Sequence, residues 1–335
     1  MLAKRGAVRY GPEPMTLTLN AYVTAALFDA DGAVFALGDG RVVWSDGQAV
    51  QAHDGAILCA ERHPSGEGVV TGGDDGKVTW TRRAGPEMIA QVQGRWIDAV
   101  ATCEVSGLIA FAAGREAHVR DIKDPAFERR FTHDKSVAGL TFDAKGRRLA
   151  AATYGGVALW YARIAEQKPV MLRWAGSHVG AAFSPDGKFL VSAMQENALH
   201  GWRLSDAKDM RMGGYPAKIK SIAFLEDGLW LATSGANGAV LWPFSGANGP
   251  MGKQATEIGF DESAMVVRLA ADPAGSILAA GLDDGRVWSC DLKTQALAML
   301  KAERGPPISA LAIDASNVAW GDEEGAAGVA DLPAL

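Results

Sequence analysis

Apolar and polar positions alternate along this chain in short runs, not in helical stripes. Between His53 and Trp80, three apolar runs are separated by turns at Ser65-Gly66 and Asp75-Gly76. Short β-type runs divided by glycine-containing turns predict a meander of antiparallel strands. One such sheet is only marginally stable alone, because one of its faces stays in water. The unit therefore needs copies of itself to pack against.

The chain supplies those copies. The first turn recurs at Asp31-Gly32, Ser65-Gly66, Ser106-Gly107, Lys145-Gly146, Asp186-Gly187, Asp227-Gly228, Ala274-Gly275 and Ser316-Asn317. The second turn recurs in phase with it, at Gly40, Gly76, Glu116, Gly156, Asn197, Gly238, Gly285 and Gly325. A repeat of about 41 residues with four strands in each copy is the signature of β-propeller blades.

We therefore predict an all-β fold, a single closed β-propeller domain over residues 1–335 built of four-stranded antiparallel blades. Eight copies predict eight blades, with seven as the alternative. The eighth copy ends at Leu335, too early for a fourth strand of its own, and Met15–Asn20 alternates like a strand. We expect this N-terminal strand to pair with the C-terminal blade and close the ring. Residues 1–14 are a candidate flexible N-terminal arm.

Tryptophan recurs at one place in the repeat. Trp44, Trp80, Trp160 and Trp242 each follow the second-turn glycine by four residues, and Trp202 follows Asn197 by five. A large aromatic ring at a fixed position in successive sheets indicates core that packs one blade on the next.

These features resemble the WD-repeat (WD40) β-propeller family. The segments FSPDG (183–187) and GGDDG (72–76) are similar to the family's turns, and His53 and His133 stand at its Gly-His corner. Two further stretches, 194–204 and 210–218, resemble stand-alone bacterial members. Unlike the family pattern, the chain has no Trp-Asp dipeptide.

The resemblance has two implications. It implies a hydrogen-bond tetrad in the second blade from His53, Thr71, Asp74 or Asp75, and Trp80. It also implies a role as a scaffold for other proteins, which is the commonest use of the family.

Composition narrows the choice of partner and compartment. The net charge of −6 and a sequence pI near 5.6 argue against binding to nucleic acid. No apolar run reaches the roughly 18 residues of a membrane span, and the N-terminus lacks the apolar segment of a secretory signal. The three cysteines lie in separate copies and fit buried thiols in a reducing compartment. We expect a cytoplasmic protein, monomeric by itself, with no membrane or nucleic-acid partner.

We find no motif for catalysis, for a cofactor or for a metal ion. The sequence lacks a nucleophile elbow, a phosphate loop and a zinc-protease motif. Three acidic pairs occupy equivalent second turns, and we favour their interpretation as solvated turn residues over a divalent-cation or basic-partner site. These pairs are Asp74-Asp75, Asp283-Asp284 and Glu323-Glu324.

We therefore predict a non-enzymatic protein–protein interaction platform. In such a propeller the second turns and the outer-to-inner connections share one face. There the sequence gathers aromatic, basic and mixed-charge residues typical of interaction hot spots. The predicted partner-binding residues are Arg95, Trp96, Asp134, Lys135, Glu196, Asn197, Tyr215, Pro216 and Lys218. The alternatives are a hydrolase or lyase with its active site at the channel mouth, and a sensor of a small ligand.

Overall fold

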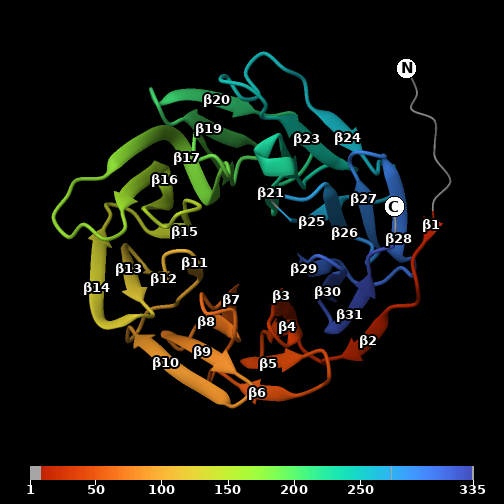
Figure 1. The fold of residues 1–335 in the computed structure, drawn as a ribbon, viewed down its shortest axis with the longest axis horizontal. Helices are drawn as coiled ribbons and strands as arrows, with labels where there is room; N and C mark the ends of the chain where they lie inside the picture. The colour runs from red at the N-terminus through yellow and green to blue at the C-terminus, as the bar shows by residue number, and fades with distance from the viewer. Residues whose placement is uncertain (1–8, 273, 334–335) are drawn as a thin grey trace. The chain divides into compact units, whose positions relative to one another are not determined.

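The computed structural model describes residues 9–272 and 274–333, and strands make up nearly all of its regular structure (Figure 1). In this part of the chain the one helical segment is the 3-10 turn η1 (Glu226–Gly228). The chain packs as two compact units. One consists of residues 27–219. The other consists of the residues up to 26 and those from 220 onwards.

Three four-stranded antiparallel meanders lie within residues 23–132. Each follows sequence order from its inner to its outer strand. They are β3 (Val23–Asp29), β4 (Gly32–Leu37), β5 (Arg41–Trp44) and β6 (Ala49–Gln51); then β7 (Ile57–Arg62), β8 (Val69–Gly73), β9 (Lys77–Arg82) and β10 (Gly85–Gln91); then β11 (Ala99–Cys103), β12 (Leu108–Ala113), β13 (Glu116–Asp121) and β14 (Asp124–Thr132).

The next sheet in the unit of residues 27–219 has six strands. They are β15 (Val137–Phe142), β16 (Arg148–Tyr161), β17 (Val170–Phe183), β18 (Phe189–Met194), β19 (Leu199–Arg203) and β20 (Lys208–Met212).

This sheet contains two of the predicted copies, because β16 and β17 each run through a turn. The first half of β16 pairs with β15 and its second half with β17, whose own second half pairs with β18. The Ala162 N–H donates to the Arg147 carbonyl, so β16 folds back on itself. The reversal lies at Gly155 and Gly156, whose positive φ angles suit glycine.

The other unit holds three further sheets. The first consists of β21 (Ile222–Leu225), β22 (Trp230–Thr233), β23 (Ala239–Pro243) and β24 (Thr256–Ile258). The second consists of β25 (Val266–Ala271), β26 (Ile277–Leu282), β27 (Val287–Asp291) and β28 (Ala296–Lys301), to which β1 (Arg9–Tyr10) adds in parallel. The third consists of β29 (Ile308–Ile313), β30 (Asn317–Asp322) and β31 (Ala326–Asp331), with β2 (Met15–Thr18) as its fourth strand.

The fold class is the predicted one, an all-β propeller of four-stranded antiparallel blades. Within the described residues the strands form seven hydrogen-bonded sheets. Six of these sheets hold one predicted copy each, and the sheet from β15 to β20 holds two. All eight predicted copies are therefore present as blades. A single domain over residues 1–335 stays a prediction.

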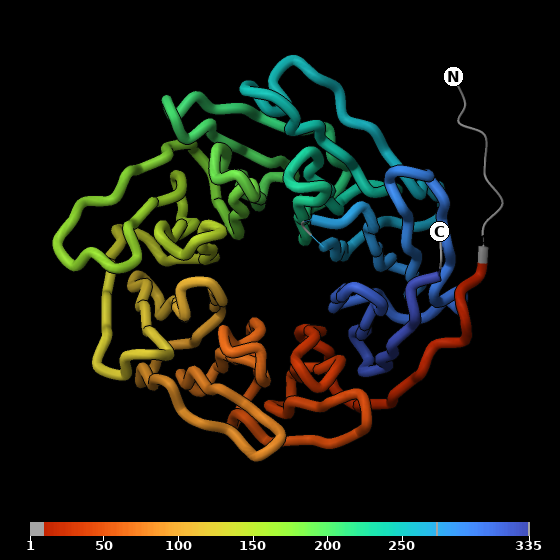
Figure 2. The backbone as a smooth tube through the Cα atoms, in the orientation of Figure 1, coloured from red at the N-terminus to blue at the C-terminus, as the bar shows by residue number. Residues whose placement is uncertain are grey.

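The N-terminal strand pairs with the last sheet as predicted. Met15 lies opposite Val329 and Thr18 opposite Ala326, so the red strand β2 runs beside the blue strand β31 (Figures 1 and 2). Leu19, just beyond β2, is buried, and its N–H donates to the Gly325 carbonyl. Of the predicted flexible arm, residues 1–8 lie outside the described residues. Arg9 and Tyr10 pair with β28.

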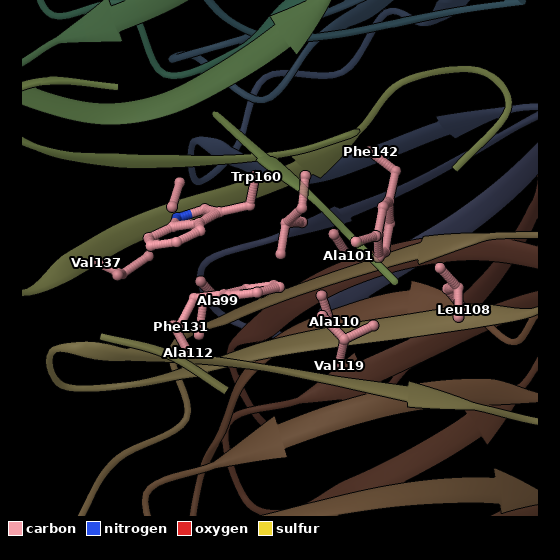
Figure 3. Close-up of a cluster of buried hydrophobic side chains, with 14 of the residues drawn as sticks. Ala99, Ala101, Leu108, Ala110, Ala112, Val119, Phe131, Val137, Phe142 and Trp160 are labelled. Atoms are coloured by element: carbon pink, nitrogen blue, oxygen red, sulfur yellow. The ribbon is translucent and has the colours of Figure 1, made fainter. Parts of the chain in front are cut away.

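Small residues on the inner strands let neighbouring blades approach closely. In the unit of residues 27–219, alanines of β11 and β12 line a buried cluster with Phe131 and Trp160, whose stacked rings lie 4.6 Å apart (Figure 3). Trp44, Trp160 and Trp202 are buried, as predicted for core. Trp80 and Trp242 are only half-buried.

The predicted tetrad of the second blade is present with one substitution. The His53 ring contacts Asp75 through Nδ1 at 3.0 Å and Thr71 through Nε2 at 2.8 Å. The fourth member is Thr79, 2.8 Å from the Thr71 hydroxyl, and not Trp80. Successive strand residues point to opposite faces, so the strand's earlier start turns Trp80 away. Its ring stacks on His63 at 4.0 Å.

Two buried histidines predict that stability falls in mild acid. Burial lowers the pKa of His63 and His200 to about 4, below the value of about 6.5 expected in the unfolded chain. Between these values the unfolded chain binds more protons, so stability present above about pH 6.5 is lost as the pH falls towards 4. Urea denaturation across this range measures the effect. A His63→Gln, His200→Gln variant should show a flatter pH dependence, and an unchanged slope would contradict this origin.

Candidate functional site

The predicted partner-binding residues lie in connections and turns of the unit of residues 27–219, at one end of its blades. Arg95 and Trp96 stand between β10 and β11, and Asp134 and Lys135 between β14 and β15. The turn between β18 and β19 carries Glu196 and Asn197, and the connection after β20 carries Tyr215, Pro216 and Lys218.

Backbone contacts bring the first of these segments together around Gly114. The Val137 N–H donates to the Gly114 carbonyl at 2.8 Å, and the His133 N–H donates to the Arg115 carbonyl at 2.9 Å. The connection that carries Asp134 and Lys135 is thus tied at both ends to the turn between β12 and β13. A Cβ atom built on Gly114 would lie 3.7 Å from Nη1 of Arg95, so the Arg95 guanidinium lies against the same turn.

Further contacts continue this surface to the last predicted segment. Thr153 pairs with Val137 on one side, and its neighbour Tyr154 pairs with Ser177 on the other. The Ser177 N–H donates to Oε1 of Glu196 at 3.1 Å.

The final link joins Asn197, which has the positive φ predicted for this turn, to the connection after β20. Its side-chain amide donates to the Pro216 carbonyl at 3.5 Å. The segments therefore form one continuous surface, which we name the turn track. Its members are residues 95–98, 114–115, 134–136, 153–155, 173–177, 195–197 and 216–218.

Exposure separates the aromatic side chains of this region. The Trp96 side chain is 65% exposed, as a binding residue requires, whereas Tyr215 is 9% exposed. The Tyr215 ring is thus part of the packed protein and is not presented to a partner. Its neighbour Pro216 is exposed, and Lys218 is half-buried.

Two exposed aromatic residues of the track, Tyr154 at 64% and Trp174 at 36%, were not among the predicted residues. Trp174 is held in place, because its ring stacks on buried His200 at 3.8 Å and its carbonyl contacts Nε2 of His178. One signal could have identified it. The dipeptide Arg-Trp occurs at Arg95-Trp96, before β11, and again at Arg173-Trp174, a few residues before the part of β17 that pairs with β18.

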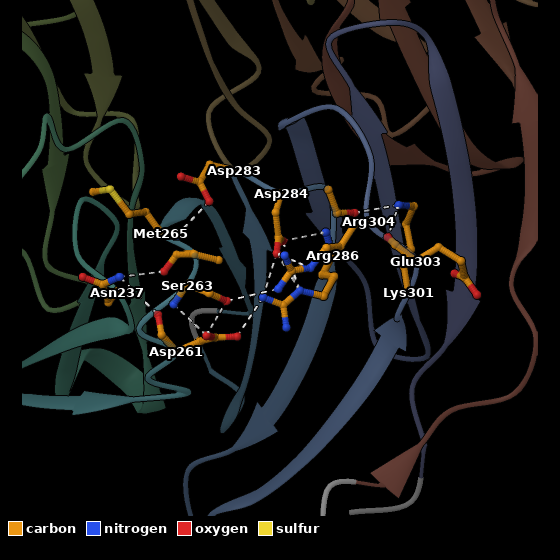
Figure 4. Close-up of polar contacts among 12 residues, drawn as sticks. Asn237, Asp261, Ser263, Met265, Asp283, Asp284, Arg286, Lys301, Glu303 and Arg304 are labelled. Carbon is orange, nitrogen blue, oxygen red and sulfur yellow. Dashed lines mark hydrogen bonds and ion pairs between the residues drawn. The ribbon is translucent and has the colours of Figure 1, made fainter.

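In the other unit, the acidic pair Asp283-Asp284 is satisfied within the protein (Figure 4). Asp284 forms ion pairs with Arg286 at 2.7 Å and Arg304 at 3.3 Å, and Asp283 accepts the Met265 N–H. Arg286 also pairs with Asp261 at 2.7 Å. Hydrogen bonds from the Ser263 N–H and from Arg286 lower the pKa of Asp261 to about 2. These contacts support the interpretation of this pair as turn residues.

Among the described residues, no three His, Cys, Asp or Glu side chains are grouped so that they could hold a metal ion. No helix within the described ranges is long and apolar enough to cross a membrane.

Comparisons with known proteins agree with this fold. The family model for the WD domain, G-beta repeat, matches residues 44–80. No curated protein matches the sequence. Among solved structures, the computationally designed Ika8 protein is similar at a TM-score of 0.75 and 17% identity, with 94% of this chain and 98% of that chain covered.

A second similar structure is the Cps50 (Swd1) β-propeller domain of Myceliophteria thermophila. It has a TM-score of 0.65 and 14% identity, and the match covers 83% of this chain and 96% of that domain. At these identities the structures establish the fold, and the family model adds the repeat. One stretch of the chain thus matches the WD-domain repeat, and the chain shares its propeller fold with these solved structures.

Proposed function

We propose that this protein is a non-enzymatic platform that binds other proteins through the turn track. The observation that carries the proposal is the exposure of Trp96, Tyr154 and Trp174 on one continuous surface. Large aromatic side chains with arginines beside them dominate the energetics of protein interfaces. Trp96 lies in a hydrogen-bonded connection, and Tyr154 and Trp174 lie in the paired strands β16 and β17, so binding needs little further ordering.

The predicted partner-binding residues fit this role in different ways. Arg95, Trp96, Asp134, Lys135, Glu196, Asn197 and Pro216 are exposed on the track. Lys218 contributes from its half-buried position, and Tyr215 acts from below as packing for this connection. We also propose that the platform acts in the cytoplasm, where its three free cysteines would stay reduced, and that it works as a monomer.

Truncation of the exposed rings should weaken binding without weakening the fold. For Trp96→Ala and for Tyr154→Ala we expect a loss of about 2 kcal/mol of binding free energy, or about 30-fold in affinity, for partners that use the track. Their unfolding free energies should change little, because most of each ring is already in water. Quantitative affinity capture from native cell extract, followed by titration of each purified partner, measures both effects.

Tyr161→Ala provides a matched control. Tyr161 is 55% exposed and ends β16, so it lies at the opposite end of the blade from Tyr154. Every partner should bind this variant as it binds the wild type. If the Trp96 and Tyr154 variants also retain every partner at unchanged affinity, the turn track is not the binding surface.

A further inference from the structure

We infer that the turn track binds an acidic, extended segment of a partner protein, whose carboxylates contact a cationic cluster of Arg95, Arg115 and Lys135. This inference rests on the proposed function and names the chemistry of its partner. It places the charged contacts between the exposed rings of Trp96 and Tyr154, which would contact apolar side chains of the same segment.

The cationic cluster follows from the hydrogen bonds around Gly114. Arg95 lies against Gly114, Arg115 follows it in the chain, and the connection that carries Lys135 is fixed to both residues by its two backbone hydrogen bonds. All three basic side chains are exposed. The one acidic residue in the same connection is Asp134. Three cations thus lie around one turn, and the carboxylates nearest to them in the chain are Asp98, Glu116 and Asp134.

These cations lack an acidic partner among the described residues. No carboxylate of the described ranges lies within ion-pair distance of Arg95, Arg115 or Lys135. The preceding second turns of the same unit differ. Arg41 pairs there with Asp39 at 2.6 Å, and Lys77 pairs with both Asp54 and Asp75. The unsatisfied guanidinium groups around Gly114 can therefore bind carboxylates of another molecule, which arginine does in a bidentate manner.

The charge of the cluster opposes that of the whole chain. The protein carries a net charge of −6, so an acidic partner would be weakly repelled by the chain as a whole and attracted locally by this cluster. The cluster therefore attracts an acidic segment, while the net negative charge of the chain disfavours other docking positions.

A nucleic-acid strand fits this surface less well than an acidic protein segment. Aromatic rings beside cations can stack bases and hold phosphates. However, exposed carboxylates interrupt the track at Asp98, Asp134 and Glu196. A continuous phosphate backbone would pass each of these, whereas a protein segment can place its carboxylates only where the cations lie.

The cluster continues directly into the aromatic residues. Trp96 follows Arg95 in the chain, and Thr153, the residue before Tyr154, pairs with Val137 at the end of the Lys135 connection. An acidic segment across Gly114 would therefore reach both exposed rings. Aromatic and apolar contacts of this kind supply affinity, while the charged contacts select the partner.

Selection of short random peptides on the purified full-length chain tests the inference. We expect enriched sequences that combine Asp or Glu with aromatic or large apolar residues. Synthetic copies should bind the Arg95→Glu, Arg115→Glu variant at least about 30-fold more weakly than the wild type. The control variant is Lys145→Glu, Arg147→Glu. It makes the same change in net charge at an exposed turn at the other end of a blade, and it should bind the peptides as the wild type does.

The outcomes separate the two proposals. Enriched peptides that are neutral or basic, or a failure of the selection to enrich acidic ones, would overturn the acidic partner. If such neutral peptides still lose affinity with Trp96→Ala, the turn track remains the platform and only the partner chemistry is wrong. A labelled single-stranded oligouridylate provides the last comparison. If it binds more tightly than every selected peptide and is lost in the Arg95→Glu, Arg115→Glu variant, the partner is RNA and the inference fails.

Discussion

Deletion of residues 1–20 is expected to destabilise the protein by roughly 3–5 kcal/mol, from the loss of the β2 ladder and of buried Leu19. The ladder joins Met15–Thr18 to Ala326–Val329. Because folded domains are stable by only about 5–15 kcal/mol, this is a large part of the total. The deletion also leaves β31 as an open edge, which favours aggregation.

Urea denaturation and light scattering of the truncated chain measure the two effects. A chain that begins at Glu13 is the control, because it loses the short parallel pairing of β1 with β28 and keeps β2. We expect it to retain most of the stability of the full chain. If the deletion of residues 1–20 leaves the unfolding midpoint unchanged, β2 is not a structural part of the last blade.

Trp160→Ala is expected to destabilise the protein by about 3–5 kcal/mol, the range for removal of a large aromatic side chain from a core. Trp160 is 7% exposed and packs on Phe131. Its indole N–H also donates to Nε2 of His133 at 2.9 Å, so the variant leaves a buried ring nitrogen without that partner. The N–H of His133 in turn holds the carbonyl of Arg115 on the turn track.

Equilibrium unfolding of this variant should be compared with that of Trp174→Ala. Trp174 is a tryptophan of the same unit, and 36% of its side chain is exposed, so its truncation should cost well under half as much. Equal losses for the two variants would show that the Trp160 cluster does not behave as core.

The strand pattern was predictable because its period and its turns are local. The inner strand of the sheet from β21 to β24 is an exception. The sequence indicates a strand from 218 to 225, whereas β21 covers only Ile222–Leu225. The Ser234 hydroxyl accepts the N–H groups of Lys220 and Ser221, which replaces ladder bonds in the first part of that segment. The sequence does not indicate such a side-chain substitute for a backbone partner.

The sequence predicted where the candidate site lies, but it did not predict which of the aromatic side chains there are exposed. Trp96 stands in a connection, where exposure is the ordinary outcome. Tyr154 and Trp174 lie within the long strands β16 and β17, so alternation alone suggests that they are strand residues. For Tyr215 the sequence predicted exposure and the structure shows burial. A tyrosine between Gly214 and Pro216 suggests an exposed loop tip, but its ring is buried.

Because β2 pairs with β31, the last blade can form only after Ala326–Asp331 has been synthesised. The two strands lie roughly 300 residues apart in sequence, a separation that makes contacts slow to form. During synthesis Met15–Thr18 leaves the ribosome roughly 300 residues before its partner strand. The early strand must remain available without pairing to the edge of another blade while the chain grows. We expect refolding to include a late step that joins the two strands, and a chaperone that holds this N-terminal segment would act until then.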